Sequence, residues 1–322
     1  MLLIPHYVLH PFYDIPGLHL LYTCDHHRVN PYKLAIAETI KPEEVVLEIG
    51  AGTGILSRFA VEAGAKRVYA VETSREMLRY AERINVTAGM DQRIVLIHGN
   101  SFQTELQEKS DVLVAEIIGG IGNDEGISTI IEDARERLLK PGGKLIPREI
   151  EVYLCPICVP EAHAQIPHVY DQDLIVPPEK GRPPFRAYYQ IIGLKPELIL
   201  AEQKLLDQID LCGHTKPTFQ RGFEFTIERN GIFSGFAAWF KARLSETIIL
   251  DTSPWAPPTC WGQAYFAVQH QCEVQKSDLL ELTFSARKDG EAFPPVYTWT
   301  GSISRGKDTV LDFEETSETA TS

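Results

Sequence analysis

Val46-Leu-Glu48-Ile-Gly50-Ala-Gly52-Thr-Gly54 decides the fold, because this stretch ends an apolar strand and opens a helix. Its glycines permit a tight turn and let the backbone approach a bound ligand closely. A strand, a glycine turn and a helix in this order are typical of a parallel α/β sheet, which binds ligands at the carboxyl ends of its strands. The stretch therefore predicts a nucleotide-type pocket at the end of strand 45–49.

The spacing of the glycines narrows the choice of ligand. A dinucleotide loop of the form GxGxxG would need glycine at position 55, where Ile55 stands. The spacing acid-x-GxGxG is instead typical of a class I S-adenosylmethionine pocket. A second acid ends the next strand in Val68-Tyr-Ala-Val-Glu72, where a carboxylate would accept both ribose hydroxyls. We predict S-adenosylmethionine as cofactor; the alternatives are an NAD site or a plain strand–turn–helix. The predicted cofactor residues in this half are Glu48, Gly50, Gly52, Gly54 and Glu72.

Residues 41–147 alternate short apolar runs with helical periodicity, which predicts a Rossmann-like α/β domain with a parallel sheet. The expected strands are 45–49, 67–71, 94–97, 112–115 and 144–146, and the expected helices are 55–63, 74–85 and a segment after Glu125 that Lys140-Pro-Gly-Gly143 ends.

From residue 148 the pattern changes to β-type runs separated by Gly, Pro and Asn turns, which predicts a mostly antiparallel, β-barrel-like domain over 148–312. Within it, the proline-rich stretch at about 156–196 is interpreted as an inserted arm. Residues 313–322 are polar and are expected to be a disordered tail.

Composition excludes several classes of protein. The net charge of −13 over 322 residues disfavours a nucleic-acid binder, which needs clustered Lys and Arg, and suits a cationic substrate. There is no apolar run long enough to cross a membrane, and the amino terminus lacks the pattern of a secretory signal. The six cysteines lack zinc-type spacing, and Cys155-Pro-Ile-Cys158 lies in an extended segment, so we expect structural thiols, no metal and a cytoplasmic location.

Two glutamates nine residues apart, Glu116 and Glu125, bracket a loop after the buried run Asp111-Val-Leu-Val-Ala. Three glycines in the loop would let it fold back and bring the two carboxylates face to face. Two such carboxylates would repel each other unless a cation lay between them, and a guanidinium fits because its N–H donors pair bidentately with carboxylates. Taken alone, either glutamate is as well explained as a helix-capping or solvated residue.

Together these residues resemble the protein arginine methyltransferase family, and the resemblance extends from about residue 13 to 312. It implies amino-terminal helices over residues 1–40 that close over the cofactor, with Arg28 binding the methionine carboxylate and Tyr13 and His19 closing the pocket. Glu116 and Glu125 match the double-glutamate loop of the family, and Glu116 is also expected among the cofactor-binding residues. The family resemblance also implies a dimerisation arm, and hence a homodimer.

The chain departs from the family pattern at three places. Cys260 stands where the family usually has histidine, next to Trp261, which would wall the guanidine pocket or pack in the core. The acid that contacts adenine in the family has no match in Gly99-Asn-Ser-Phe102, so Ser101 is expected to serve instead. Tyr22 replaces a methionine of many asymmetrically dimethylating members, which leaves the methylation pattern open.

The predicted activity is methyl transfer from S-adenosylmethionine to the guanidino group of arginine, with Glu116, Glu125, Cys260 and Trp261 at the catalytic centre. Three alternatives stay open at this point. The acceptor is an arginine in a protein or peptide, free arginine, or another small guanidino compound. A catalytically silent relative that binds S-adenosylmethionine as a regulator is a further alternative, because fold resemblance alone does not establish function.

Overall fold

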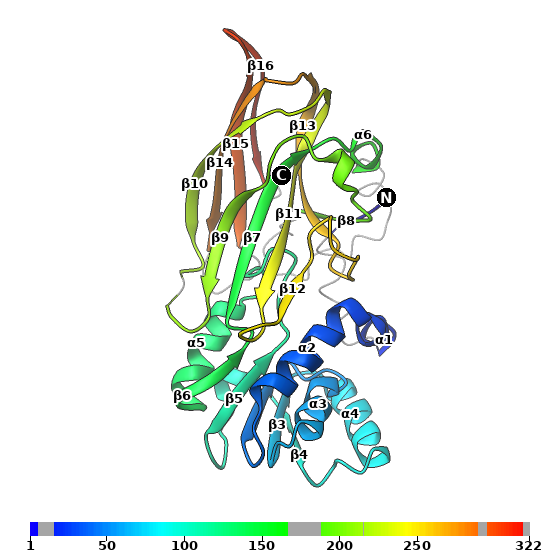
Figure 1. Cartoon of the computed structure of the whole chain (residues 1–322), viewed down its shortest axis with the longest axis vertical. Helices are drawn as coiled ribbons and strands as arrows, with labels where there is room; N and C mark the ends of the chain where they lie inside the picture. Colours follow the sequence, from blue (N-terminus) through cyan, green and yellow to red (C-terminus); the bar gives the residue numbers. More distant parts are fainter. Residues whose placement is uncertain (6–15, 167–187, 215, 289–294, 318–322) are drawn as a thin grey trace, which may run out of the picture.

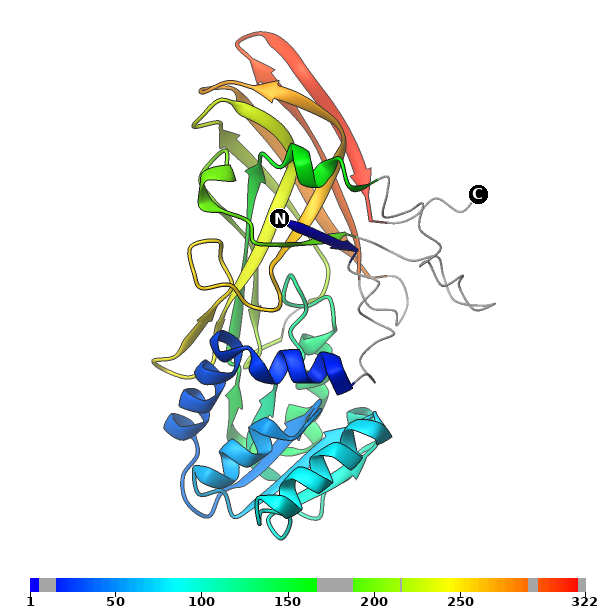
Figure 2. The ribbon, with the colours of Figure 1, turned by 90° about the vertical axis from the view of Figure 1, so that its right-hand side faces the viewer.

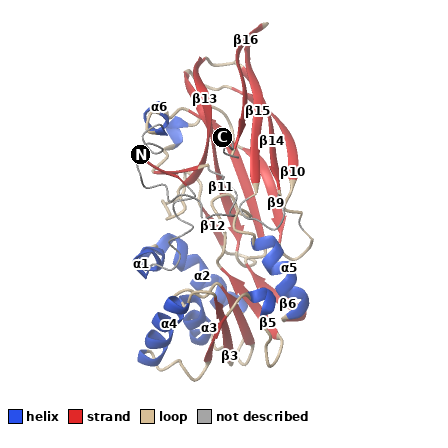
Figure 3. Ribbon diagram, turned by 180° about the vertical axis from the view of Figure 1, so that it is seen from behind, coloured by secondary structure: helices blue, strands red, loops and turns tan. Residues whose placement is uncertain are grey.

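The computed structural model describes residues 1–5, 16–166, 188–214, 216–288 and 295–317. Helices gather around a parallel sheet in one half of the molecule, and long antiparallel strands form the other half (Figures 1 and 3). The Rossmann-like domain and the antiparallel domain predicted from the sequence are both present. The described helices include none that is both long and apolar enough to cross a membrane.

The parallel sheet has the strand order β4-β3-β2-β5-β6. All five residues of β2 (Val45–Ile49) are buried, as expected for a central parallel strand. Its neighbours are β3 (Arg67–Glu72) and β5 (Ser110–Ala115), while β4 (Ile94–His98) and β6 (Leu139–Ile146) form the edges. The connecting helices are α3 (Ile55–Glu62), α4 (Arg75–Thr87) and α5 (Ile127–Arg137). Gly50, Gly52 and Gly54 all have positive φ, which explains why glycine occupies these turn positions.

The segment Lys140–Gly143 differs from the prediction, because it lies inside β6. Helix α5 ends earlier, at Arg137, and the strand begins at Leu139. The pairing between β5 and β6 shifts register between Ser110 and Val112, so the glycine-rich residues form an irregularity in the strand and not a connecting turn.

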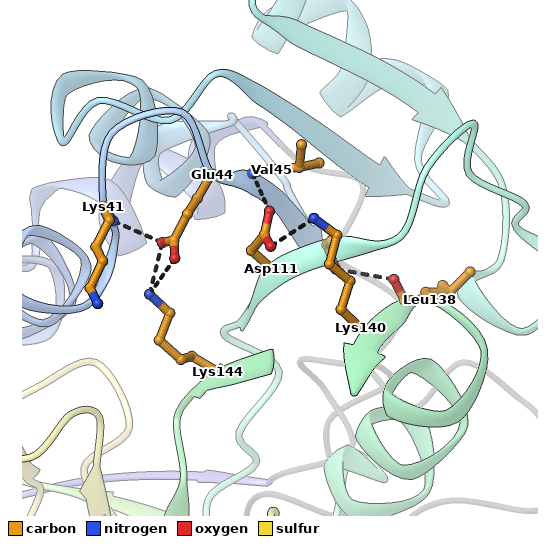
Figure 4. A network of polar contacts seen from close by, with 8 residues as sticks. Lys41, Glu44, Val45, Asp111, Leu138, Lys140 and Lys144 are labelled. Atoms are coloured by element: carbon orange, nitrogen blue, oxygen red, sulfur yellow. Dashed lines mark hydrogen bonds and ion pairs between the residues drawn. The ribbon is translucent and has the colours of Figure 1, made fainter. Parts of the chain in front are cut away.

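A polar network joins β6 to the starts of β2 and β5 (Figure 4). Lys144 Nζ pairs with Glu44 at 2.8 Å. Asp111 accepts a hydrogen bond of 2.9 Å from the Val45 amide and pairs with Lys140 Nζ at 2.7 Å. These contacts tie the three strands together at one end and leave the carboxyl ends free to form a ligand site.

The second half contains two antiparallel sheets. One has the order β1-β8-β13-β11-β7-β9, with β12 paired to β11, and the other has the order β10-β14-β15-β16. Their bounds are β1 (Leu2–Pro5), β8 (Tyr189–Ile192), β13 (Gln263–Val274), β11 (Gly231–Arg243), β7 (Glu149–Ile157), β9 (Lys204–Asp210), β12 (Ile249–Asp251), β10 (Phe219–Thr226), β14 (Leu279–Arg287), β15 (Val296–Arg305) and β16 (Asp308–Thr316). Closure of these sheets into a barrel stays a prediction.

Aromatic side chains fill the space between the two antiparallel sheets. Phe266 of β13 meets Phe284 of β14 with ring centroids 4.9 Å apart, and Phe236 of β11 meets Phe225 of β10 at 6.3 Å. All four rings are buried. Edge-to-face and tilted contacts of this kind add to the stabilisation that burial of apolar area supplies.

The amino-terminal helices α1 (Pro16–Cys24) and α2 (His26–Thr39) lie between the two halves (Figures 1 and 2). Residues 2–5 were expected to belong with these helices, but they form strand β1 and pair with β8 at the edge of the large sheet. The apolar run Leu2-Leu-Ile explains this, because an edge position lets it add a strand to an existing sheet.

Two further sequence expectations need correction. The stretch 156–196 was expected to be an arm, yet its ends belong to the large sheet as the last residues of β7 and as β8, with a short helix α6 (Pro160–His163) between them. The middle of the proposed arm, 167–187, lies outside the described residues. The start predicted for the tail, residue 313, is too early. Strand β16 runs to Thr316, and Phe313 packs against Phe233 and Phe236.

Candidate active site

A cavity of about 310 Å³ lies at the carboxyl ends of the parallel strands, where α1, α2 and the second domain meet them. Its lining falls into two regions. The first is formed by the glycine turn, His19 and Glu72, and the second by Glu116, Glu125, Tyr188, Cys260 and Trp261. Residues far apart in the chain, from His19 to Trp261, thus share one cavity.

The glycine region leaves room only for a bare backbone. A Cβ atom on Gly50 would lie 2.7 Å from Ile117 Cγ2, and one on Gly52 would lie 3.0 Å from His19 Nδ1. Glu72 holds the turn in place, because one carboxylate oxygen accepts the Gly52 amide at 2.7 Å and the other accepts the Ser74 amide at 2.8 Å. The Glu72 carboxylate lines the cavity next to this anchored turn.

Glu48 is only 2% exposed and also lines the cavity. Its carboxyl group makes a short hydrogen bond with Ser57 Oγ of α3. Burial raises the pKa of Glu48 to about 8, although the bond from Ser57 and the positive charge of Arg58 oppose this shift. Glu48 therefore connects strand β2 to helix α3 next to the glycine turn. Its raised pKa keeps the carboxyl group protonated at neutral pH.

Glu116 forms an ion pair with Arg28, an interaction that the sequence did not predict. The guanidinium carbon of Arg28 also lies 4.6 Å from the ring centre of Tyr22 and 5.1 Å from that of Trp261. Two aromatic faces and a carboxylate thus surround a planar cation, which is a favourable arrangement for a guanidinium. Arg28 lies in the first turn of helix α2, and the position of this turn is fixed by the amino-terminal cap Asp25.

Asp25 links that helix to the loop carrying Cys260. One carboxylate oxygen of Asp25 accepts the amides of His27 and Arg28 at 3.1 Å, and the other accepts the Cys260 amide at 2.6 Å. Burial, supported by the negative charge of Asp25, raises the pKa of the Cys260 thiol to about 12, against the opposing charge of Arg28. The thiol is therefore neutral at physiological pH.

Trp261 stands at the boundary between the two domains. Its indole N–H donates to the Ile118 carbonyl at 2.8 Å, and its ring meets Phe240 edge-on with centroids 5.1 Å apart. The two roles considered from the sequence, wall of the pocket and core packing, are thus combined in one side chain. The hydrogen bond also connects the loop of Trp261 to the loop that carries the two glutamates.

The glutamate loop folds back as a tight hairpin. The amide and carbonyl of Gly119 exchange hydrogen bonds with those of Gly122 at 3.2 and 3.0 Å. Asp124, which is fully buried, accepts the amides of Gly120 and Ile121 at 3.1 and 3.2 Å. Glu116 and Glu125, at the two ends of this loop, both line the cavity.

The predicted residues differ in where they lie. Ser101 does not line this cavity; its carbonyl accepts a hydrogen bond of 2.7 Å from Arg137 Nη2. Tyr13 lies outside the described residues. Sequence reasoning missed Asp25, Asp124, Tyr188 and Gln190 as parts of the site, and only Asp25, directly before a helix start, carried a recognisable signal as a capping residue. The described residues contain no group of three or more His, Cys, Asp or Glu side chains suited to a metal ion.

Two family models match the chain. Residues 26–149 match the model of Ribosomal protein L11 methyltransferase, and residues 185–293 match that of the Arginine methyltransferase oligomerization subdomain. The first match covers the parallel sheet and the second covers most of the antiparallel domain, so each domain has its own known counterpart.

Curated relatives and solved structures resemble most of the chain. The probable protein arginine N-methyltransferase 6 of Arabidopsis thaliana is 25% identical over 90% of this chain and 77% of its own length. Protein arginine N-methyltransferase 6 of Xenopus laevis is 29% identical over 82% of each chain. In fold, the chain resembles protein arginine methyltransferase 10 of Arabidopsis thaliana, at 22% identity, with a TM-score of 0.78 over 95% of this chain and 98% of that one. It also resembles the Trypanosoma brucei PRMT1 enzyme-prozyme complex with AdoHcy, with a TM-score of 0.77 at 21% identity over the same shares of the two chains.

Proposed function

Because the chain belongs to the protein arginine N-methyltransferase family, we propose that the two regions of its cavity hold a methyl donor and an arginine guanidinium side by side. The enzyme is an S-adenosylmethionine-dependent arginine methyltransferase, and S-adenosylmethionine is its cofactor. The residue roles, the nature of the acceptor and the oligomeric state are the parts that we propose.

The glycine region fits S-adenosylmethionine. The cavity accepts a ligand where Gly50 and Gly52 present bare backbone, and Glu72 offers acceptor oxygens for ribose hydroxyls. Arg28 would hold the methionine carboxylate, and His19 would close the pocket beside Gly52. The chemistry that S-adenosylmethionine supplies there is an electrophilic methyl group on a sulfonium.

One observation carries the assignment of the acceptor region. Glu116 already binds a guanidinium, that of Arg28, between the rings of Tyr22 and Trp261. The side chain of Arg28 stands in for the acceptor arginine and indicates which chemical group these residues recognise. When the cofactor carboxylate draws Arg28 away, Glu116 and Glu125 would grip the acceptor instead.

The two carboxylates would also activate the acceptor. A guanidinium nitrogen is a poor nucleophile because its lone pair is delocalised. Glu116 and Glu125 would draw positive charge toward the nitrogens they bind, which leaves more electron density on the attacking nitrogen. Holding this nitrogen in a near-attack position would remove on the order of 7–11 kcal/mol of the barrier. Glu125 is our proposed acceptor of the proton that the methylated nitrogen loses.

An arginine in a protein or peptide is the acceptor we favour, because the relatives in Arabidopsis and Xenopus are named as protein arginine methyltransferases. Mass spectrometry of products from free arginine and from an Arg-Gly-rich peptide, each incubated with S-adenosylmethionine, tests this. Methylated peptide with no methylated free arginine is the expected result. Transfer to free arginine alone would overturn the choice of acceptor, and the masses and fragments also give the methylation pattern.

We further propose a homodimer in the cytoplasm. The match of residues 185–293 to an oligomerization subdomain supports self-association, and six free cysteines support a reducing compartment. Light scattering coupled to size exclusion tests the dimer, and a monomer at micromolar concentration would contradict it.

A further inference from the structure

The segment at the start of strand β8 contributes two side chains that are two residues apart, Tyr188 immediately before the strand and Gln190 within it. Both line the cavity, whereas Tyr189 between them packs in a separate apolar cluster with Tyr265. This alternation follows from strand geometry, which sends successive side chains to opposite faces. Tyr188 and Gln190 thus face the same site from one short strand.

Tyr188 holds the glutamate loop. Its hydroxyl donates a short hydrogen bond to the carboxylate of Asp124, and both side chains are buried. A buried carboxylate is costly unless donors surround it, and Asp124 receives the Tyr188 hydroxyl together with the amides of Gly120 and Ile121. Since Asp124 directly precedes Glu125, this anchor fixes the backbone from which Glu125 projects.

Gln190 holds the opposite loop. Its side-chain amide donates to the carbonyl of Cys260 at 2.9 Å and to that of Trp261. Gln190 is only 7% exposed, so these bonds are largely shielded from water. Two loops are therefore hydrogen-bonded to the segment at the start of β8: the loop of Trp261, which walls the pocket, and the loop between Glu116 and Glu125.

We propose that Tyr188 and Gln190 are positioning residues that together set the distance between Glu125 and Trp261, and so shape the gap for the acceptor guanidinium. The identity of the acceptor rests on the proposed function, whereas the attachment of the two loops to Tyr188 and Gln190 does not. A misplacement of about 1 Å can reduce turnover by 10²-fold, so a strand that fixes two loops at once would have a large effect on catalysis.

The test uses Tyr188→Phe, Gln190→Met and the double variant in the full-length protein. Each substitution removes hydrogen-bond donors with little change in volume. We expect kcat for the Arg-Gly-rich peptide to fall 10- to 100-fold in each single variant, while the Kd for S-adenosylmethionine stays within about twofold. In the double variant the loss should be smaller than the product of the single losses, because both residues serve one geometry.

Tyr265→Phe is the matched control. Tyr265 is fully buried in the neighbouring strand β13 and donates to the Ser234 carbonyl at 2.7 Å, away from the cavity lining. It should lose a comparable hydrogen bond, and a comparable amount of stability, without loss of kcat. Turnover within twofold of the unmodified enzyme in both test variants, or an equal fall of kcat in the control, would overturn the proposal.

Hydrogen exchange separates this inference from the proposed function. Tyr188→Phe should speed exchange of the Gly120 and Ile121 amides, and Gln190→Met should speed that of the Gly262 amide, which closes the turn after Thr259. These readouts do not need turnover. If exchange changes as expected but no arginine compound is ever methylated, the proposed function fails and the attachment stands; unchanged exchange in both variants would overturn the attachment.

Discussion

Arg28 pairs with Glu116 at the carboxyl end of β5, so a residue expected at the cofactor carboxylate contacts one expected to serve both cofactor and acceptor. The pair is largely shielded, with side-chain exposures of 16% for Arg28 and 9% for Glu116. The pair places a guanidinium in the region proposed for the acceptor, which Glu125 also lines. Binding of the cofactor carboxylate would have to change the partner of Arg28, which makes the pair a link between the two regions of the cavity.

Replacement of Arg28 by alanine should weaken cofactor binding. Truncating one partner of a buried, hydrogen-bonded charge pair costs about 2–5 kcal/mol, so we expect the Kd for S-adenosylmethionine to rise at least about tenfold. Isothermal titration calorimetry measures it. Arg79→Ala, in which the lost side chain is 74% exposed on α4, is the control that should bind normally. An unchanged Kd in the Arg28 variant would exclude its role at the cofactor carboxylate.

The same pair predicts an order of binding. Because Arg28 fills the region proposed for the acceptor, an Arg-Gly-rich peptide should bind at least about tenfold more weakly to the free enzyme than to the enzyme loaded with S-adenosylhomocysteine. Peptide titrations with and without saturating S-adenosylhomocysteine compare the two affinities. Equal affinities would mean that Arg28 does not compete with the acceptor.

Glu116→Gln should abolish most of the activity, because the amide keeps the shape of the side chain but loses the negative charge that grips a guanidinium. Removing one group that stabilises the transition state typically costs about 10²–10³ in kcat, which a labelled-methyl transfer assay detects. Glu62→Gln provides a control, since Glu62 pairs with Lys33 at 3.1 Å on the surface. Normal turnover of the Glu116 variant would contradict the proposed grip.

Local patterns predicted the parallel sheet well and the acceptor region less well. Strand β2 has the bounds expected from sequence, because its five buried positions, four of them apolar, lie between a polar turn and the glycine loop. Strand β8 was missed, because its partners β1 and β13 lie far away in the sequence and its proline-rich surroundings hid the short run Tyr188-Tyr-Gln-Ile-Ile. Likewise, the pairs Arg28–Glu116 and Tyr188–Asp124 depend on how the domains meet, which no local spacing encodes.

Cys260 should not act as an acid or base in the reaction. Burial raises the pKa of its thiol to about 12, so the thiol stays protonated across the range in which the enzyme works. We expect Cys260→Ser to keep the shape of the pH profile of kcat/KM between pH 6 and 9. Cys260→His should add an ionisation to this profile, because an imidazole titrates in that range and would stand beside Asp25. A Ser variant that loses an ionisation present in the unmodified enzyme would refute this view.

Glu48 should make the stability of the protein depend on pH. Burial raises its folded-state pKa from the ordinary 4.5 to about 8, so between these values the folded chain holds a proton that the unfolded chain has released. The stabilisation is complete below about pH 4.5 and is lost as the pH rises toward 8, with a slope of at most about 1.4 kcal/mol per pH unit.

Denaturant unfolding at pH 6 and 9 compares the unmodified protein with Glu48→Gln, which is neutral at both. The variant should lose less stability between the two pH values, whereas Glu224→Gln on the exposed face of β10 should behave like the unmodified protein. Equal pH dependence in all three proteins would show that Glu48 is ionised in the folded state.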